Sequence, residues 1–454
     1  MLTYSKMVTI VLMVIQAHSK LIALVTLSRH GKRAPNPDVA VLCPRHSDNM
    51  KRYNVPYKQL TPLGMIEMET LGKHIRDVYV HQQKLLSPSL SNSHTTDTFR
   101  PSSFETYMRA DAADRCAQSA IAMGYGLYPN GTGPRPFSLQ PVSVVHETLP
   151  NEWVFSAPKN KCRATAARDT AQYGATRAKE LFAAHRGVLA RLAETCRGPR
   201  VEEYPLVEGG LDSVQGLKDV VDALVFDEEQ DFPGLREPLT DRGMAELRQL
   251  QYQMLMERCY GSDRMVTYWA SGFPRTLLQH ISTTLAEMKG EGGGEGGLLA
   301  RYYSYHGHRE LLYAMGLLLG WPFHFPGQPV VFNQSALPSG ATLFFELHTG
   351  HHSSWLEFYH WTPAGGREAV SLTKCPPPCS VEAFSTVVNQ HISRTGTFEE
   401  ICSPASPPDW PLRISLLLNV AFILGWALWA GLARNATRRM TGSDGQTRQY
   451  QSIT

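Results

Sequence analysis

The first strong signal along the chain is a continuous apolar run rather than an alternating one. Residues 21–27 hold one polar side chain, that of Thr26, among six apolar ones. A strand that is covered on both faces, as in a parallel sheet, has this composition. We therefore predict a buried strand that ends close to Arg29. Ligands of such sheets bind beyond the carboxyl ends of the strands.

An amphipathic helix and several later strands are predicted from the same kind of pattern. Thr61 suits a helix N-cap and Pro62 the first helical position. Apolar side chains then recur at helical spacing, at Leu71, Ile75, Val78 and Tyr79. Short apolar segments indicate strands, the last two of them a hairpin, at residues 266–269, 300–305, 342–347 and 355–359.

The residues between the early and the late strands have a different character. Residues 151–260 are richer in helix formers and charge, and they show little strand pattern. The sequence thus predicts an α/β fold, in which a parallel-rich sheet is flanked by helices and built from residues 20–150 and 261–402. Residues 151–260 form an inserted, mainly helical subdomain in this prediction.

Both ends of the chain carry apolar segments that are typical of targeting. Residues 1–19 place Lys6 before an apolar stretch and end on a small-x-small sequence, as in a signal peptide. A Pro-rich stalk is predicted at residues 403–413 and a transmembrane helix at residues 414–432. The latter segment is uncharged and, at about 1.5 Å per residue, matches the ~30 Å hydrocarbon core of a bilayer.

Positive charge beside this segment gives the predicted orientation. Arg434, Arg438 and Arg439 follow it, whereas Arg413 alone precedes it. The excess of arginine places the tail, residues 433–454, in the cytoplasm. The bulk of the chain is then lumenal or extracellular, as in a single-pass type I membrane protein.

The predicted tail ends on a sorting pattern. Tyr450 is followed three residues later by the bulky aliphatic Ile453. Tyrosine-based endocytic signals, which clathrin adaptors bind as an extended peptide, have this layout. We therefore expect an endosomal or lysosomal membrane location and a clathrin adaptor as a partner of the tail.

Composition and cysteine usage agree with this topology. The 454 residues are 43% hydrophobic and 19% charged, and a net charge of +3 without a polybasic tract gives no reason to expect nucleic acid as a partner. All eight cysteines lie between the two apolar segments, in the compartment where disulfides form. Cys375 and Cys379, separated by three prolines, predict a local disulfide. Asn130 and Asn333 are expected glycosylation sites.

The candidate chemistry begins immediately after the first strand. The segment from Arg29 to Pro35 holds His30 between two arginines. Such a histidine, at the end of a buried strand, suits a nucleophile that attacks phosphate, and a charged surface loop is the alternative. Arg109 precedes a predicted helix N-terminus capped by Asp111, where a phosphate is favoured.

Four motifs in one order resemble the histidine acid phosphatases, in particular the membrane-anchored, lysosomal type. They are Arg-His-Gly-x-Arg-x-Pro at residues 29–35, the segment 59–65 with its helix, Arg109 to Arg115, and Tyr303 to His306. The resemblance spans residues 20–402. It implies a histidine-phosphatase-like fold and hydrolysis of phosphate monoesters, with neither cofactor nor metal.

By position, the resemblance also implies roles for individual residues. His30 is the nucleophile, which forms a phosphohistidine that water then hydrolyses. Arg29, Arg33 and Arg109 offset the charge of the phosphate with planar, bidentate donors, and His306 adds a further donor.

Other residues of the motifs are expected to have structural roles. Arg115 ties its helix to neighbouring carboxylates rather than contacting substrate. Cys162 pairs with Cys402 in the family. The partners of the other cysteines stay open, at Cys43, Cys116, Cys196 and Cys259. The oligomeric state is open as well, and a homodimer is compatible with the sequence.

The pattern breaks at Gly307, where the family has an aspartate that protonates the leaving alcohol. General acid catalysis is worth about 10²–10⁴-fold, so this departure matters. Three alternatives are open. In the first, the proton donor is His308, at the offset where a related branch has a glutamate. In the second, Glu310 or a carboxylate from a distant loop donates the proton. In the third, the protein is a catalytically impaired membrane glycoprotein with a binding or endocytic trafficking role.

A few other signals favour structural interpretations. A group of histidines suggests a metal cluster at first sight, but surface or core histidines are expected, at His348, His351, His352 and His360. Lys32, inside the first motif, is expected to be solvated. A further alternative is a relative of the phosphoglycerate mutases, which share the Arg-His-Gly chemistry. This assignment agrees poorly with a secreted, glycosylated, cysteine-rich chain.

Overall fold

The computed structural model describes ten stretches of the chain. These are residues 19–89, 105–133, 136–197, 213–235, 237–290, 300–321, 337–351, 353–403, 419 and 422–434. The chain divides into two compact units, Met1–Cys402 and Ser403–Thr454. The four motifs described in the sequence all belong to the first unit.

The first unit is built around a mixed sheet with the strand order β3-β2-β4-β1-β5-β6-β7, and β8 pairs with β6. The strands are β1 Lys20–Arg29, β2 Thr106–Ala110, β3 Val144–His146, β4 Tyr302–Gly307, β5 Thr342–Thr349, β6 Ser354–Thr362, β7 Gly366–Ala369 and β8 Cys379–Ser380. The first four strands in this order are parallel, whereas β5, β6 and β7 run antiparallel to their neighbours. The predicted hairpin is therefore present as β5 and β6.

The register of the parallel strands brings three chain segments to one edge. Arg29 at the end of β1 lies opposite Gly307 of β4, and Ala110 at the end of β2 lies opposite His306. The residues that follow all three strands consequently emerge side by side. This edge is where ligands of parallel sheets bind.

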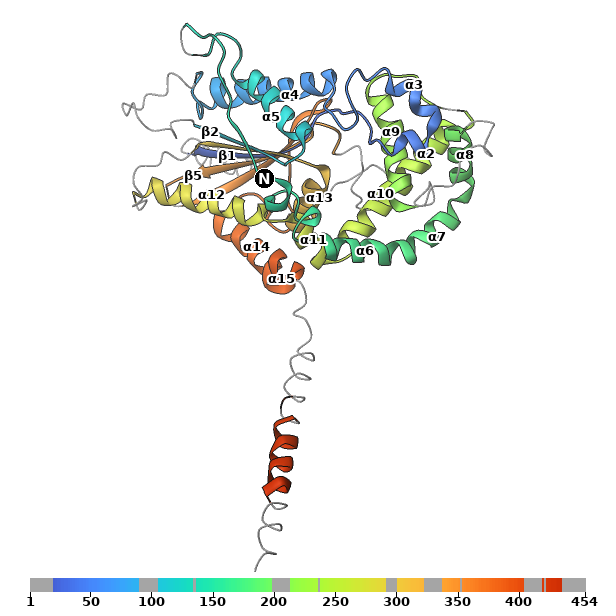
Figure 1. Cartoon of the computed structure of the whole chain (residues 1–454). Helices are drawn as coiled ribbons and strands as arrows, with labels where there is room; N and C mark the ends of the chain where they lie inside the picture. Colours follow the sequence, from blue (N-terminus) through green and yellow to red (C-terminus); the bar gives the residue numbers. More distant parts are fainter. Residues whose placement is uncertain are drawn as a thin grey trace, which may run out of the picture. The chain divides into compact units, whose positions relative to one another are not determined.

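Helices cover both faces of the sheet (Figure 1). The α-helices of the first unit are α2 Val39–Leu42, α3 Ser47–Met50, α4 Pro62–Ile75, α5 Asp114–Leu127, α6 Arg163–Ala175, α7 Arg177–Ala184, α8 Arg186–Arg197, α9 Val214–Glu229, α10 Asp241–Tyr260, α11 Asp263–Ala270, α12 Phe273–Met288, α13 Arg309–Leu319, α14 Val381–Thr395 and α15 Phe398–Cys402. α4 and α5 lie against one face, while α12, α13 and α14 lie against the other.

The pair α4 and α5 packs unusually closely. A Cβ atom on Gly72 would lie 2.0 Å from the carbonyl oxygen of Met123, and one on Gly126 would lie 2.0 Å from that of Glu69. Only glycine permits this approach of two helix backbones. Thr61 caps α4 as predicted, because its side chain accepts a hydrogen bond from the backbone N–H of Gly64 at 3.1 Å.

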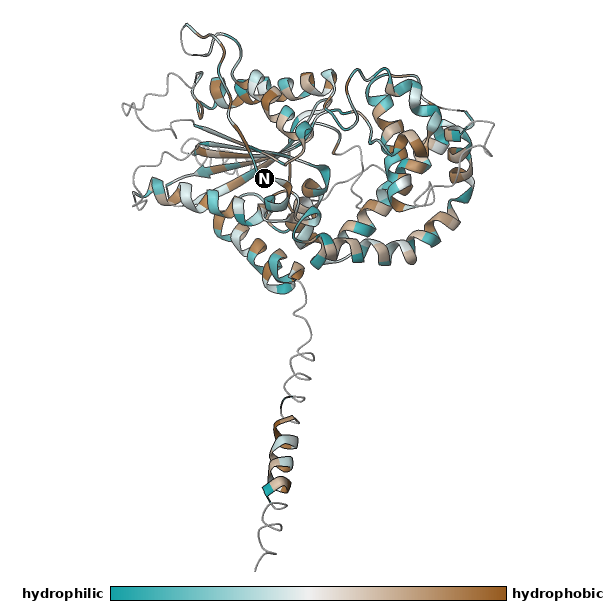
Figure 2. Ribbon diagram, viewed as in Figure 1, coloured by the Kyte–Doolittle hydropathy of each residue, from teal (hydrophilic) through white to brown (hydrophobic). Residues whose placement is uncertain are grey.

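The predicted helical region is present between residues 163 and 260 as helices α6 to α10, without a strand in its described part. These helices enclose a core of their own together with residues of α2, among them Val39, Leu192, Val220 and Leu247. In Figure 2 they carry both hydrophobic and hydrophilic residues, as amphipathic helices do. The region is nevertheless part of the same compact unit as the sheet.

Two local predictions were wrong. Residues 266–269 lie in helix α11 and not in a strand, because Ser262 caps this helix and the short apolar run is buried as a helix. A short buried run does not distinguish the two by periodicity. Asp111 does not cap the following helix, since α5 begins at Asp114 with Ala113 before it. The side chain of Asp111 lies elsewhere, as described below.

Three disulfides lie in the described part of the first unit, two of them between segments far apart in the sequence. Cys162 is bonded to Cys402 and Cys375 to Cys379, as the sequence suggested. Cys43 is bonded to Cys196, which links the segment after β1 to α8. The remaining two cysteines, Cys116 and Cys259, are buried and not in disulfides.

Most of the predicted targeting features lie outside the described residues. This holds for residues 1–18, for Asn333, and for Tyr450 and Ile453 of the tail. In the second unit, residues 422–434 are helical. Among the described residues, no helix has the length and apolar character needed to cross a bilayer.

The disulfides give a first prediction about stability. Cys162 and Cys402 are 240 residues apart in the sequence, whereas Cys375 and Cys379 are 4 apart. Chain entropy then predicts a loss of about 5 kcal/mol in the free energy of unfolding for the Ala/Ala variant of the long-range pair and about 2 kcal/mol for that of the local pair. Urea denaturation of the two double variants measures the difference. Equal losses would contradict the entropic explanation.

Candidate active site

A cavity of about 390 Å³ lies at the sheet edge where β1 and β4 end. Its lining comes from the loop after β1, from the first turns of α5 and α13, and from α9 in the helical region. Arg29, His30 and Arg33 line it, together with His308 and Arg309. The cavity thus joins the sheet to the helical region.

His30 is held in one orientation at the floor of this cavity. Its backbone N–H donates to the carbonyl oxygen of Gly307 at 3.0 Å, which ties it to β4. Its ring Nδ1 lies 2.8 Å from the carbonyl oxygen of Gly31. A carbonyl only accepts, so Nδ1 carries the hydrogen and Nε2 keeps its lone pair. Burial, and then the charge of Arg115, lowers the pKa of His30 well below its usual value, which keeps the imidazole neutral.

The two arginines of the first motif are held by backbone carbonyls. Arg29 Nη1 donates to the carbonyl oxygen of Leu337 at 2.8 Å. Arg33 Nη1 donates to the carbonyl oxygen of Ala34 at 2.8 Å, and its guanidinium lies 4.7 Å from the ring centre of Phe226. Burial and the neighbouring Arg115 lower the pKa of Arg33 to about 9, so it stays charged in acid.

Another arginine of the cavity is Arg115. Arg115 lines the cavity from the first turn of α5, with Nη2 3.5 Å from Nδ1 of His308. Arg109 lies within β2 and donates from Nη2 to both carboxylate oxygens of Glu152 at 3.3 Å. It does not belong to the described lining of the cavity. In the structure this strand residue is thus paired with a buried carboxylate, and its contact with phosphate stays a prediction.

His306 also lies short of the edge. It is fully buried between Ser28 and Ala110 of the neighbouring strands, and Nε2 lies 2.8 Å from Oγ of Ser304. Burial lowers its pKa to about 3, so the ring is neutral. It is absent from the described cavity lining, and its contact with phosphate stays a prediction.

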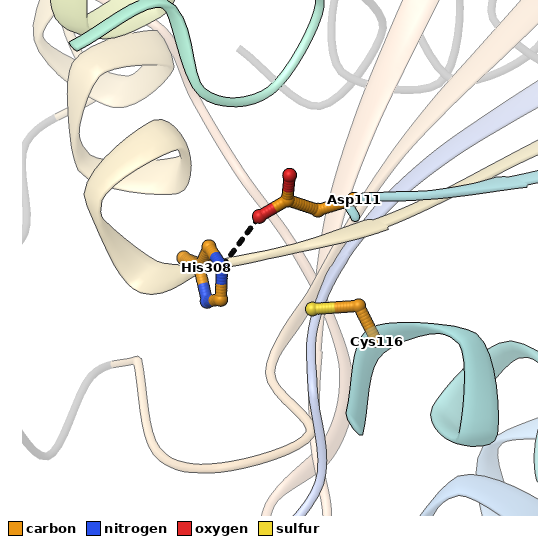
Figure 3. A group of neighbouring side chains, drawn as sticks. All are labelled: Asp111, Cys116 and His308. Carbon is orange, nitrogen blue, oxygen red and sulfur yellow. Dashed lines mark ion pairs between the residues drawn. The ribbon is translucent and has the colours of Figure 1, made fainter. Parts of the chain in front are cut away.

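His308 faces His30 across the cavity. The ring centres are 5.4 Å apart, and the planes meet at 79°. On its other side, Nε2 of His308 lies 2.6 Å from Oδ2 of Asp111 (Figure 3). Burial, followed by the charges of Lys159 and Arg115, lowers the pKa of His308 to about 4 against the opposing effect of Asp111.

Glu310 lines the cavity from the first turn of α13. Although burial opposes it, the charges of Arg309 and Lys218 lower the pKa of Glu310 to about 2. This carboxylate is ionised in mild acid and holds no proton to donate. Among the two candidate donors near Gly307, His308 is thus the better acid.

The structure also shows what occupies the place of a side chain at position 307. A Cβ atom on Gly307 would lie 3.0 Å from Cδ1 of Phe155, so this ring fills the space. A longer side chain there requires Phe155 to move. The glycine and the aromatic ring are therefore complementary.

Positive charge dominates the cavity. Two acidic residues among its described lining, Asp222 and Glu310, face eight cationic ones, at Arg29, Arg33, Lys58, Arg115, Lys159, Lys218, Arg258 and Arg309. Asp222 accepts hydrogen bonds from Arg309 Nη2 at 3.1 and 3.2 Å. Lys159 and Lys218 are also paired with Asp111 and Asp219 beside the cavity, and the positive charge that remains suits a polyanionic ligand.

Two groups of side chains have the composition of a metal site. Asp111, Cys116 and His308 place one ligand atom each within 4.8 Å of one another. Lys159 Nζ is 3.5 Å from the same Asp111 oxygen, and Arg115 faces His308, so fixed cations compete with a metal ion. This arrangement favours proton chemistry over a metal.

The second such group contains one of the predicted histidines. Glu346, His348 and Glu357 lie close together, but Glu346 also accepts hydrogen bonds from the Tyr79 hydroxyl and from Arg367. His348 belongs to this hydrogen-bonded network, in keeping with a structural role. His360 is packed against Trp321, with ring centres 5.1 Å apart.

Comparison with known proteins agrees with this geometry. The sequence model of the histidine phosphatase superfamily, branch 2, matches residues 20–359. A putative acid phosphatase of Caenorhabditis elegans is 32% identical over 106 residues, which are 23% of this chain. The match spans about a fifth of that relative, 21% of its length.

Solved structures show the same fold. The apo form of Hafnia alvei phytase has a TM-score of 0.58 at 17% identity, covering 86% of this chain and 99% of the phytase. The phytase of Citrobacter braakii has a TM-score of 0.57 at 19% identity, with 82% and 97% covered. Fold, motif order and the matched family together lead to one conclusion. The chain belongs to the histidine phosphatase superfamily, branch 2.

Proposed function

We propose that this protein is an acid phosphatase that hydrolyses phosphate monoesters through a phosphohistidine on His30, with His308 as the proton donor. The observation that carries the proposal is the unprotonated Nε2 of a neutral His30, held by Gly31 inside a cationic cavity. Phosphoryl transfer depends mainly on positioning and charge stabilisation. The cavity provides both before substrate binds.

The reaction has two steps. Nε2 of His30 attacks phosphorus, the P–N bond forms, and the bond to the leaving oxygen breaks as His308 gives that oxygen a proton. Water then attacks the phosphohistidine, returns a proton to His308, and the P–N bond breaks to release phosphate. Arg29, Arg33 and Arg115 stabilise the charge of the equatorial oxygens in both steps.

The competing proposal is a catalytically impaired glycoprotein that binds phosphorylated ligands or acts in endocytic trafficking. Gly307 in place of the family's aspartate is the feature that favours it. The short distance from His308 to His30 favours the enzyme instead. We also propose a single-pass type I anchor in endosomal or lysosomal membranes, on the sequence patterns at residues 414–432 and Tyr450 to Ile453.

The charge of the cavity suggests a substrate preference. Eight cationic residues exceed the needs of a single phosphate. A solved relative of this fold, Hafnia alvei phytase, is known in complex with myo-inositol hexakis sulphate. We propose that substrates with several phosphates bind better than those with one.

Substitution of the two histidines tests the enzyme directly. We expect His30→Ala to reduce hydrolysis of every phosphomonoester to background, because the nucleophile is lost. His308→Ala should slow an alkyl phosphate by about 10²–10⁴-fold and an aryl phosphate with an activated leaving group much less, because the latter hardly needs an acid. Steady-state rates from about pH 4 to 7 measure both effects.

A control and two contrary outcomes complete this test. Glu310→Gln, at the other candidate donor, should leave the dependence on leaving group unchanged. If the parent and His30→Ala hydrolyse at the same background rate, the glycoprotein proposal replaces the enzyme. If His308→Ala turns over alkyl phosphates fully, His308 is not the donor.

The pH dependence follows from the protonation states required. His308 must be protonated to act, and its pKa in the free protein is about 4. We therefore expect kcat/KM for an alkyl phosphate to fall as pH rises above about 4, as His308 loses its proton. Bound phosphate attracts this proton, so the fall in kcat should come at higher pH. A rate that increases steadily between about pH 4 and 7 would contradict the assignment.

The substrate preference has a separate test. We expect KM for myo-inositol hexakisphosphate to be at least about tenfold lower than for a monophosphate, and we expect salt to reduce the difference by screening. Measurements at low and high ionic strength check both points. Equal KM values at low salt would contradict the proposed preference.

A further inference from the structure

We propose that Asp111 is the positioning residue of the proton donor: its carboxylate holds His308 through Nε2 and leaves Nδ1 to deliver the proton to the leaving oxygen. This inference rests on the proposed function and deepens it. The family motif supplies an aspartate directly after the histidine of β4, at the position of Gly307 here. In this chain an aspartate from another strand supports a histidine instead.

The contact between Asp111 and His308 is short and shielded from solvent. Oδ2 of Asp111 lies 2.6 Å from Nε2 of His308, and the two side chains are 1% and 11% exposed. Figure 3 shows the carboxylate directed at one ring nitrogen, with the other nitrogen on the far side of the ring. The contact has the distance of an ion pair and not the alignment of a hydrogen bond, so its strength comes from charge once His308 is protonated.

Asp111 is itself fixed by several groups. Its Oδ1 accepts from the backbone N–H of Ala112 at 2.9 Å, and Oδ2 accepts from Oγ of Ser156 at 2.9 Å. Its backbone N–H donates to the carbonyl oxygen of His306 at 2.9 Å, which fastens the end of β2 to β4. Although burial opposes it, the contact with His308 lowers the pKa of Asp111, so the carboxylate is ionised.

The surroundings of His308 define its tautomer. Arg115 Nη2 lies 3.5 Å from Nδ1, and a guanidinium has no acceptor. Nδ1 therefore carries the lone pair before substrate binds, and the hydrogen is on Nε2, which lies close to Oδ2 of Asp111 without the alignment of a hydrogen bond. A substrate phosphate attracts Arg115, which frees Nδ1 to take up a proton.

The imidazolium then carries two protons with different fates. The proton on Nε2 stays with Asp111, while the proton on Nδ1 passes to the leaving oxygen as its bond to phosphorus breaks. In the second step, Nδ1 recovers a proton from the attacking water as the P–N bond of His30 breaks. No other reactant is needed, and the free histidines are restored.

Charges around His308 explain why a carboxylate is needed. Burial, Lys159 and Arg115 on α5 disfavour a positive ring, and the facing His30 is neutral. Cys116 beside it is an uncharged thiol, because burial raises its pKa to about 12. Glu310 supplies negative charge from α13 but is paired with Arg309. Asp111 is the carboxylate in direct contact, so it offsets the cations at the ring itself.

The experiment compares Asp111→Asn with the parent on two substrates. We expect kcat for an alkyl phosphate to fall about 10–100-fold, as for other losses of a supporting carboxylate, and kcat for an activated aryl phosphate to fall far less. The alkaline limb of the alkyl profile should shift to lower pH, since the imidazolium loses its stabilising charge. In the double variant, Asp111→Asn should lower kcat for the alkyl phosphate little beyond the loss caused by His308→Ala alone, because the two residues act as a unit.

Controls separate this inference from the proposed function and from misfolding. Asp114→Asn changes an exposed carboxylate three residues away and should leave both substrates and the pH limb unchanged. Retained turnover of the aryl phosphate by Asp111→Asn shows that the variant folds. If His30→Ala is inactive but Asp111→Asn slows both substrates equally with an unmoved limb, Asp111 has only a structural role. If the parent is inactive as well, the proposed function itself fails.

Discussion

The parallel register of β1, β2 and β4 is the constraint on which the site depends. Because these strands end at one edge, His30, Asp111 and His308 meet although they are far apart in the sequence. Backbone hydrogen bonds continue past the strand ends, from His30 to Gly307 and from Asp111 to His306. The catalytic side chains thus stand on a rigid edge rather than on free loops.

Burial of many cations at this edge has consequences for its protonation. Burial, followed by the charges of the arginines, keeps His30 neutral, and Arg33 stays charged in acid. Burial and the charges of Lys159 and Arg115 likewise disfavour a protonated His308. The acid that we propose in this cavity therefore needs a carboxylate partner, and Asp111, directly after β2, meets that need. The helical region contributes Asp222 of α9, which accepts a hydrogen bond from Arg309 of α13.

Gly307 and Phe155 show how the departure from the family motif is accommodated. The phenyl ring occupies the space next to the glycine, and the proposed proton donor lies one residue later, at the start of α13. A histidine at position 308 gains Asp111, directly after β2, as its partner, whereas Asp111 would repel a carboxylate at that position. Gly307, Phe155, His308 and Asp111 thus form one arrangement in this chain.

Local sequence determined much of this protein. The apolar run before Arg29, the Thr61 cap, the strand at Tyr302 and the hairpin of β5 and β6 could be predicted, because burial and capping follow from side chains close in sequence. The proposed nucleophile His30 was recognisable for the same reason, since its motif is contiguous. The strand expected at residues 266–269 failed, because a short apolar run fits a buried helix equally well.

Tertiary structure alone decided which charged groups share the cavity. Arg109 and Arg115 stand in one motif, and no local pattern reveals that Arg109 meets Glu152 while Arg115 reaches His308. Asp111 looked like a helix cap, and its contact with His308 depends on the pairing of strands nearly two hundred residues apart. Such contacts are set by sheet register and helix packing, which the order of residues along the chain does not display.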